Sequence, residues 1–524
     1  DWVLIPESPP DLDNWELKMV ERLRAGRSTG RRDSIVMLAE GARDREGNII
    51  GSSYVQQVLE EHLKEEVRVT VLGHVQRGGA PSAFDRNLGT LLGHATVNHI
   101  LESKPEDEPQ VIGLRGNRIT MSPLMDCVEK TLSVGQAIED HQYARAMQIR
   151  GSNFIESFDT FRTLIRALPH AVTPGQKRMR IAVMNAGSPA AGMNTGIRAA
   201  VRLGIDAGHI LFGIQNGFQG LIDGEIQELH WMSVNGWTTM GGSELGTNRK
   251  VPEGTDFYAI ARNIEKYGIE GLLIIGGWTA YVSAFALLEE RKHFPAFNLP
   301  VMLLPASINN NLPGSDFSIG ADTALNNIVE AVDKIKQSAV ASKRCFVVEV
   351  MGGFCGYLAL MSGMATGAER VYINEEGVTL KDLVDDVETL NSDFSEGKRL
   401  GLIIRNEKAN HVYSTPFMSA LFEEEGQGLF DVRAAILGHL QQGGDPTPFD
   451  RIQATRFAKR SIELLADQIQ QKSNKSMFMG LQGKEIVFHD LQDFPRMVDM
   501  EHFRPWVQWW MENRDIVQLL ARKS

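Results

Sequence analysis

Short apolar runs rich in Val and Ile alternate along the chain with amphipathic stretches. Runs of about four to eight such residues predict strands buried on both faces, as in a parallel sheet. The intervening segments, such as 195–208 and 323–339, repeat their apolar positions with helical spacing. The predicted strands are 180–186, 271–277, 301–306, 345–352, 370–376 and 400–406.

This alternation predicts an α/β fold made of doubly wound sheets with mainly parallel strands. In such folds ligands bind at the carboxyl ends of the strands. Polar and glycine residues follow the predicted strands in the segments NAGSPAAG, IGGWT, PASINNN, EVMGG and IIRNE. We therefore expect five loops to meet at one rim and to form a binding site there.

Composition and charge narrow the class of protein. The 524 residues are enough for about two to four domains, and the net charge of −12 argues against a nucleic-acid binder or a basic membrane-surface protein. Three well-separated cysteines fit a reducing compartment, so we expect a cytoplasmic protein in which Cys355 is a buried thiol. No apolar run approaches the ~20 residues that span a bilayer, and the opening residues lead us to expect no signal peptide.

One phrase occurs twice. Residues 68–86 and 433–451 align without gaps, with 11 of 19 positions identical and an offset of 365. Further upstream, MLAE (37–40) aligns with IRNE (404–407) at an offset of 367, which brings Glu40 onto Glu407, and VLIPE (3–7) aligns with VYINE (371–375). The chain therefore holds an internal repeat whose first copy matches the later part of the second.

The repeat predicts the domain organisation. Residues 1–150 form the later part of a first copy, residues 151–178 a linker, and residues 179–524 a complete second copy. On this alignment the first copy lacks about 190 residues at its amino end, and the chain opens without an initiator Met. We interpret it as a piece of a longer polypeptide.

The repeated phrase has the chemistry of an anion site. We expect a strand to end at Leu72, so that His74, Gln76 and Arg77 project at the turn closed by the following glycines. Arg68 would lie on the same strand, and two guanidinium groups with an imidazole match phosphate oxygens. A carboxylate at the end of another predicted strand, Glu40, could accept hydrogen bonds from sugar hydroxyls. Mutual pairing of these charges is the alternative, and the duplication disfavours it.

Five motifs together carry a family resemblance. TVLGHVQRGGAPSAFDR, IAVMNAGSPAAGMN, LLIIGGWTAY, SINNNLPGSDFSIGADTA and VVEVMGGFCGYLA resemble ATP-dependent 6-phosphofructokinase of the eukaryotic, internally duplicated type. The resemblance covers nearly the whole chain. It implies transfer of a phosphoryl group from ATP, with Mg²⁺, to the 1-hydroxyl of fructose 6-phosphate in the amino-terminal half. It also implies activation by fructose 2,6-bisphosphate bound to the carboxy-terminal half.

The second copy departs from the active pattern at three places. Active copies of this family carry GGDG, TIDND and MGR, whereas this copy reads Gly276-Gly277-Trp278, Ser307-Ile308-Asn309 and Met351-Gly352-Gly353. An amide cannot act as a general base, Trp278 replaces an acid on the nucleotide side, and Gly353 removes a cation. The second copy is therefore predicted not to transfer phosphoryl groups.

The positions retained in the second copy match the family's sugar-phosphate contacts, which here imply an effector site. Amides in place of carboxylates would also remove repulsion toward a second phosphate. The candidate effector residues are Arg249, Ser307, Ile308, Asn309, Asn310, Asn311, Arg344, Met351, Gly352, Gly353, Glu407, Arg433, His439, Leu440, Gln441, Gln442 and Arg504. The family register around Arg504 is shifted by about one residue, which leaves that position open.

In the first copy, the resemblance implies a fructose 6-phosphate site. Its candidate residues are Glu40, Arg68, His74, Val75, Gln76 and Arg77. The catalytic base, the magnesium ligands and the nucleotide loop are expected outside this chain. The family arrangement lets the counterpart of Arg68 reach a neighbouring subunit, and Arg344 and Arg433 would do so at the effector site. A homo- or hetero-oligomer, a tetramer or larger, is therefore expected.

Several alternatives stay open at this point. The chain could belong to a non-catalytic regulatory subunit that binds a sugar bisphosphate, or to a pyrophosphate-dependent relative, since the loop that separates the donors is not in the chain. The glycine-rich turn after residue 186 suits phosphate binding but lacks a Walker sequence, so retained nucleotide binding is undecided. Trp506, Trp509 and Trp510 are predicted to be core or interface residues.

Overall fold

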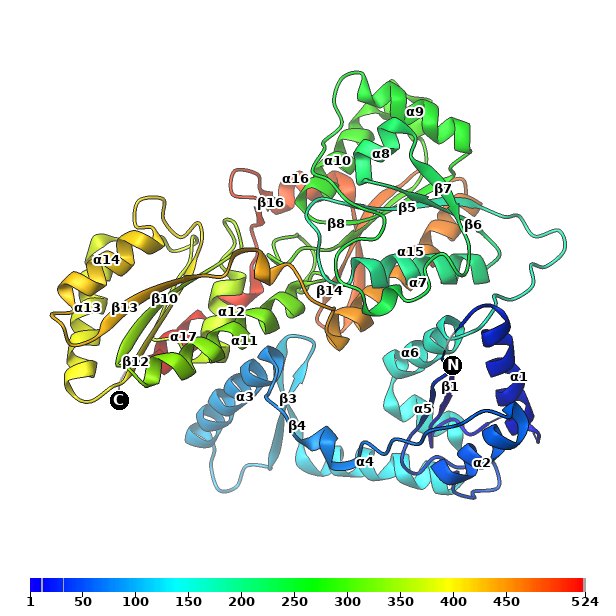
Figure 1. The fold of residues 1–524 in the computed structure, drawn as a ribbon, viewed down its shortest axis with the longest axis horizontal. Coiled ribbons are helices and arrows are strands. Elements are labelled where there is room, and N and C mark those ends of the chain that lie inside the picture. Colours follow the sequence, from blue (N-terminus) through cyan, green and yellow to red (C-terminus); the bar gives the residue numbers. More distant parts are fainter. Residues whose placement is uncertain (11–12, 32, 522–524) are drawn as a thin grey trace.

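The computed structural model describes residues 1–10, 13–31 and 33–521, and the side chain of Val340 lies outside this description. The two larger sheets of the second copy lie one on each side of a central group of helices (Figure 1). The larger sheet has the strand order β15-β14-β9-β8-β5-β6-β7. Its strands are β5 (Arg180–Ala186), β6 (Ile210–Ile214), β7 (Ile226–Leu229), β8 (Gly271–Gly276), β9 (Val301–Pro305), β14 (Ser476–Gln482) and β15 (Glu485–Asp490).

The inner strands of this sheet are parallel, and only the edge strands β7 and β15 run antiparallel to their neighbours. Alternate residues enter two different cores: Ile181 and Val183 belong to one, Ala182 and Met184 to the other. Burial on both faces explains the unbroken apolar runs of the sequence. The helices packed on this sheet are α7 (Met193–Asp206), α8 (Gly217–Asp223), α9 (Asp256–Tyr267), α10 (Trp278–Glu289) and α15 (Pro448–Gln470).

The smaller sheet is wholly parallel, in the order β11-β12-β10-β13. It too carries helices on both faces, with α13 and α14 in one core and α11 and α12 in the other. The predicted doubly wound α/β architecture is therefore confirmed. The elements are β10 (Arg344–Val350), β11 (Arg370–Tyr372), β12 (Leu400–Asn406), β13 (Asp431–Ile436), α11 (Ala321–Val340), α12 (Tyr357–Thr366), α13 (Leu380–Ser395) and α14 (Thr415–Glu425).

The first copy is smaller and has its own core around Trp15, Met19 and Leu23. A two-stranded parallel sheet packs with α1 and α2 around this core, and a helix and a hairpin extend toward the second copy (Figure 1). Its elements are β1 (Trp2–Leu4), α1 (Trp15–Ser28), β2 (Val36–Leu38), α2 (Ser52–Leu63), α3 (Ala83–Glu102), β3 (Gln110–Arg115), β4 (Arg118–Pro123), α4 (Leu124–Glu139) and α5 (Tyr143–Arg150). Helix α6 (Ser152–Leu164) follows in the linker.

The strand register of the two copies confirms the repeat. In the first copy, Trp2 pairs with Val36. In the second copy Arg370 pairs with Ile403, the positions that the sequence alignment makes equivalent. The β3–β4 hairpin corresponds in the same way to the β14–β15 hairpin. The duplication therefore preserved three-dimensional structure as well as sequence.

One prediction is wrong. The strand expected to end at Leu72 is not formed, and a 3-10 helix, Gly73–Arg77, directly follows an extended segment without a ladder. In the second copy the equivalent segment is β13, which pairs with β10. Among the described residues of the first copy there is no counterpart of β10. A strand needs a partner for its backbone groups, and here none is within reach.

The carboxy-terminal segment crosses between the two sheets of the second copy (Figure 1). It contains α16 (Phe494–Met497), the short hairpin β16 (Val498–Asp499) and β17 (Arg504–Pro505), and α17 (Arg514–Ala521). Trp510 is buried in the central core and the indole N–H of Trp509 donates to Asp316 O at 2.7 Å, whereas Trp506 is 65% exposed. The prediction that these tryptophans are core or interface residues is thus confirmed for Trp510, which is a core residue. None of the helices in the described ranges has the length and hydropathy to cross a bilayer.

Candidate functional site

The loops at the carboxyl ends of the parallel strands meet at one rim. The loop after β5 lies against the loop after β8, because a Cβ on Gly187 would come within 3.5 Å of Gly277 N. The loop after β8 in turn lies against Ser307, after β9. Across the gap between the two sheets, a Cβ on Gly353 would lie 3.8 Å from Asn309 Nδ2. Six loops, including those after β12 and β13 described below, therefore converge as the strand order requires.

The loop after β9 uses most of its amides to hold its own shape. Asn310, with a left-handed φ of 50°, donates to Asp316 O and accepts from Ser318 N. Asn311 accepts from Ser307 Oγ at 2.8 Å and donates to Phe503 O at 2.7 Å. Ile308 is buried. Asn309 is left half-buried and faces Gly353 across the rim, so it is the amide best placed to meet a ligand.

The opposite side of the rim is built on the smaller sheet. Gly353 N donates to Glu407 Oε1 at 2.8 Å, and Met351 N donates to the buried Gln441 at Oε1. These bonds fix the glycine loop against β12 and the segment after β13. His439 is exposed, and its Nδ1 lies 2.7 Å from Gln442 Oε1, which orients the imidazole. Leu440 is 59% exposed beside them.

The candidate arginines of the effector site lie in two separate places. Arg249 lies at the rim, where its guanidinium donates to Ser188 Oγ at 2.8 and 3.1 Å. Arg344 and Arg433 lie on β10 and β13, toward the amino ends of these strands, and both are within 4 Å of Asp431 Oδ2. Both arginines therefore lie away from the rim, Arg433 on the edge strand β13 and Arg344 at the start of its inner neighbour β10. The rim of one chain does not bring them together with Asn309.

Arg504 is engaged inside the protein. Its guanidinium donates to Phe354 O at 2.8 Å and to Asn374 Oδ1 at 3.0 Å, and it lies 3.4 Å from Glu375. Burial raises the pKa of Glu375 although Gly356 N donates to this carboxylate. The structure therefore places Arg504 behind the glycine loop, where it supports Phe354.

A residue that the sequence did not single out lines the rim instead. Phe503 has a left-handed φ of 53°, and its ring meets the Trp278 indole at 5.5 Å between centroids and 79° between planes. Phe494 contacts the same indole from α16, at 5.4 Å. Trp278 is thereby held in the loop where active copies carry an acid. No periodicity or motif marked Phe503, because its neighbours come from distant parts of the chain.

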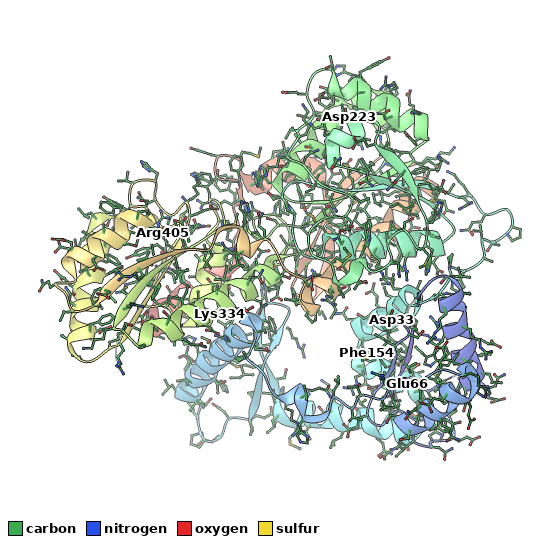
Figure 2. All side chains as sticks on the ribbon, in the orientation of Figure 1. Asp33, Glu66, Phe154, Asp223, Lys334 and Arg405 are labelled. Carbon is green, nitrogen blue, oxygen red and sulfur yellow. The ribbon has the colours of Figure 1, made fainter. Side chains whose placement is uncertain are left out.

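The candidate residues of the first copy are mostly open to solvent. Arg68 is paired with Glu66 at 2.9 Å, and both side chains are more than 70% exposed; Glu66 is labelled in Figure 2, in the part of the first copy that is remote from α3. Val75 is 78% exposed. The remaining candidates, Glu40, His74, Gln76 and Arg77, are exposed as well. The segment has the residues of an anion site without the enclosing strand pair that the second copy possesses.

Neither a metal cluster nor a reactive thiol stands out in the described part of the chain. No group of three or more His, Cys, Asp or Glu side chains there is placed to hold a metal ion. Burial raises the pKa of the Cys355 thiol far above its ordinary value, which confirms that this cysteine is a buried structural residue.

Arg405, labelled in Figure 2, is a buried guanidinium on β12 that pairs with Glu349 at 2.9 Å.

Comparison with known families identifies this arrangement. The model of the family "Phosphofructokinase" matches residues 1–100 and 180–465, which correspond to the two copies. The chain belongs to the phosphofructokinase family. The family resemblance predicted from the five motifs is thereby confirmed.

Curated relatives of this phosphofructokinase chain include muscle-type ATP-dependent 6-phosphofructokinases. The chain is 43% identical to that of Canis lupus familiaris and 44% identical to that of Oryctolagus cuniculus, over 533 aligned residues. The alignments cover 100% of this chain and 68% of each relative. These relatives are kinases by name.

Solved structures agree on the fold. Phosphofructokinase from Pichia pastoris in the T-state has a TM-score of 0.94 at 36% identity, covering 100% of this chain and 62% of that one. The Saccharomyces cerevisiae structure has a TM-score of 0.95 at 35% identity, with 72% of that chain covered. A pyrophosphate-dependent phosphofructokinase from Marinobacter aquaeolei, 16% identical with a TM-score of 0.51, shares the fold alone.

Proposed function

We propose that this chain is part of an ATP-dependent 6-phosphofructokinase that phosphorylates the 1-hydroxyl of fructose 6-phosphate. The products are fructose 1,6-bisphosphate and ADP, and the enzyme acts in the cytoplasm. The sequence relation to named ATP-dependent enzymes over the whole chain supports this assignment. The first copy contributes the sugar-phosphate contacts from Glu40 and from the segment Arg68–Arg77.

The second copy serves as the effector site, and its ligand is fructose 2,6-bisphosphate. One observation carries this proposal: the rim keeps Arg249, Glu407 and His439, while the position of the catalytic base holds Asn309 facing Gly353. An amide can donate to a phosphate or a hydroxyl but cannot accept the proton that phosphoryl transfer releases. The site can therefore bind a sugar bisphosphate without turning it over.

The second copy is not a nucleotide site in this proposal. Trp278 lies between Phe494 and Phe503 where an active copy would hold an acid next to the nucleotide phosphates. Mg²⁺ accompanies ATP in the reaction. The described residues of this chain do not suit that ion, since Trp278 and Asn309 supply no carboxylate, so we assign no step to it here.

An oligomer completes the effector site. Arg433 lies on β13, the edge strand of the small sheet, which has only one strand neighbour, and Arg344 lies at the start of that neighbour, β10. The same edge exposes Ile436 and Leu440, at 60% and 59%. Their equivalents in the first copy, Val71 and Val75, are each 78% exposed. Apolar side chains and unpaired backbone groups on one edge favour contact with another subunit, which would receive both arginines.

The test is calorimetric titration of the oligomeric enzyme with fructose 2,6-bisphosphate. Arg433→Ala is expected to weaken binding about 30-fold or more, because an arginine paired with a desolvated phosphate contributes roughly 2 kcal/mol or more. Arg496→Ala is the matched control, since that side chain is 86% exposed and remote from the small sheet. Equal affinity in the wild type and in Arg433→Ala would remove the second copy from the effector role.

A further inference from the structure

Helix α11 contacts the start of α3 in the first copy and the loop Gly438–Gly443 in the second. In each copy, the loop that contains the candidate ligand residues runs directly into a helix, α3 or α15, whose first turn reads Phe-Asp-Arg. The equivalent residues Phe84 and Phe449 stack on each other, with ring centroids 6.2 Å apart and planes inclined by 24°. The two loop-to-helix junctions therefore begin side by side, and α11 runs past both.

Neighbouring asparagines of α11 hold one junction each. Asn326 Oδ1 accepts a hydrogen bond at 3.0 Å from the backbone N–H of Ala83, the first residue of α3. Asn327 Nδ2 donates to Gly443 O at 2.8 Å and to Leu440 O at 3.3 Å, in the loop of the second copy. Because the two asparagines are adjacent on a rigid helix, displacement of one loop moves the contacts of the other.

A second pair of contacts strengthens the same junctions. Arg86 Nε donates to Pro81 O at 3.1 Å, and its terminal nitrogens form a bidentate pair with Asp333 of α11 at 2.6 and 3.1 Å. The exposed fractions of these two side chains are 19% and 32%, so the pair is partly shielded from water. On the other side, Asp322 Oδ2 accepts from Thr447 Oγ1 at 2.7 Å, where Thr447 caps α15.

We propose that the first half of α11, from Asp322 to Asp333, couples the substrate loop Gly73–Gly79 of the first copy to the effector loop Gly438–Gly443 of the second. Asn326, Asn327 and Asp333 act as positioning residues and touch neither ligand. The proposal rests on the proposed function, because it needs an effector in the second copy. Effector bound at the second loop then raises the affinity of the first loop for substrate. By linkage, bound substrate raises the affinity for effector by the same factor.

The experiment compares wild type with Asn326→Ala in the oligomeric enzyme. Asn326→Ala removes the contact to α3 and leaves the contacts of Asn327 to the effector loop. The measured quantity is the ratio of half-saturating fructose 6-phosphate without and with fructose 2,6-bisphosphate, together with calorimetric affinity for the effector. We expect that ratio to shrink by roughly threefold or more, while effector affinity without substrate stays at the wild-type value.

Lys334→Ala is the matched control on the same helix. Lys334, labelled in Figure 2, is 71% exposed, and its ammonium pairs with Glu330 one turn away on the same helix. Lys334→Ala should leave the ratio of half-saturating fructose 6-phosphate concentrations unchanged. Arg86→Lys keeps the charge and loses the bidentate geometry, so it should also reduce the ratio, and it replaces Asn326→Ala if that variant unfolds.

The outcomes separate this inference from the proposed function. A wild-type enzyme that does not bind the effector would overturn both. Variants that bind the effector and keep the full ratio would overturn the coupling role of α11 alone. Loss of effector affinity in Asn326→Ala, measured without substrate, would also overturn it, because α11 would then support the effector site rather than connect two sites.

Discussion

Among single side chains, Asp450 is the most tightly enclosed acid. It is fully buried and accepts hydrogen bonds from Gly320 N, from Thr323 N and from Thr323 Oγ1. Burial raises its pKa to about 7, with a further contribution from the neighbouring Asp322, although these hydrogen bonds act in the opposite direction. The equivalent residue in the first copy, Asp85, is exposed and serves only as part of a helix cap.

This carboxyl makes stability depend on pH. The folded state keeps its proton up to about pH 7, whereas the unfolded chain releases it near pH 4, so the group favours folding at low pH. Its contribution falls as the pH rises from about 4 to about 7, by about 1.4 kcal/mol per pH unit. Urea unfolding midpoints at pH 5 and pH 7.5 should show a smaller pH-dependent loss in Asp450→Asn than in wild type. Parallel losses in both proteins would contradict the assignment.

The helices α3 and α15 illustrate how one sequence element changes with its surroundings. Both begin at a Ser or Thr cap followed three residues later by an Asp. Ser82 is half-buried, and its hydroxyl bonds with Asp85 in its own turn. Thr447 caps Asp450 N and also donates to Asp322 of α11, so this cap joins two helices. The motif predicts each helix start equally well, and only the packing distinguishes their roles.

The difference between the caps predicts different costs. Thr447→Ala should destabilise α15 by about 2 kcal/mol, since it removes both the cap and the shorter of the two hydrogen bonds that Asp322 Oδ2 accepts. Ser82→Ala should destabilise α3 by about 0.5 kcal/mol. Native-state hydrogen exchange of the amides in the first two turns of each helix measures both effects in one experiment. Equal effects in the two helices would show that the bond between Thr447 and Asp322 contributes nothing.

For the molecule as a whole, the exposed edge of the small sheet is the feature with the largest consequence. In the oligomer proposed above, Ile436→Lys should favour smaller assemblies, because a charge on this edge opposes association. Val384→Lys, at a 43% exposed position on α13, is the control on another face of the same sheet. Size-exclusion chromatography with light scattering checks both variants. An unchanged assembly in Ile436→Lys would place the subunit contact elsewhere.

Much of this architecture was predictable from local patterns. The pattern of apolar residues predicts the strands at 180–186 and 400–406 and the helix at 323–339. Burial on one or both faces of an element requires apolar residues at regular spacing, which makes the pattern visible in the sequence. The sequence repeat predicted two related copies, and the structure shows that their equivalent strands share one register. The meeting of the loops at one rim followed from the parallel strands.

Other features depended on contacts between distant residues. The segment before Leu72 has the composition of a strand but lacks the neighbour that β13 finds in β10, so no ladder forms. Phe503 and Asn326 carry no motif, and their positions are set by residues far away in the sequence. The spacing of apolar residues shows which face of a helix or strand is buried. The residues that pack against that face come from distant parts of the chain, so only the tertiary structure identifies them.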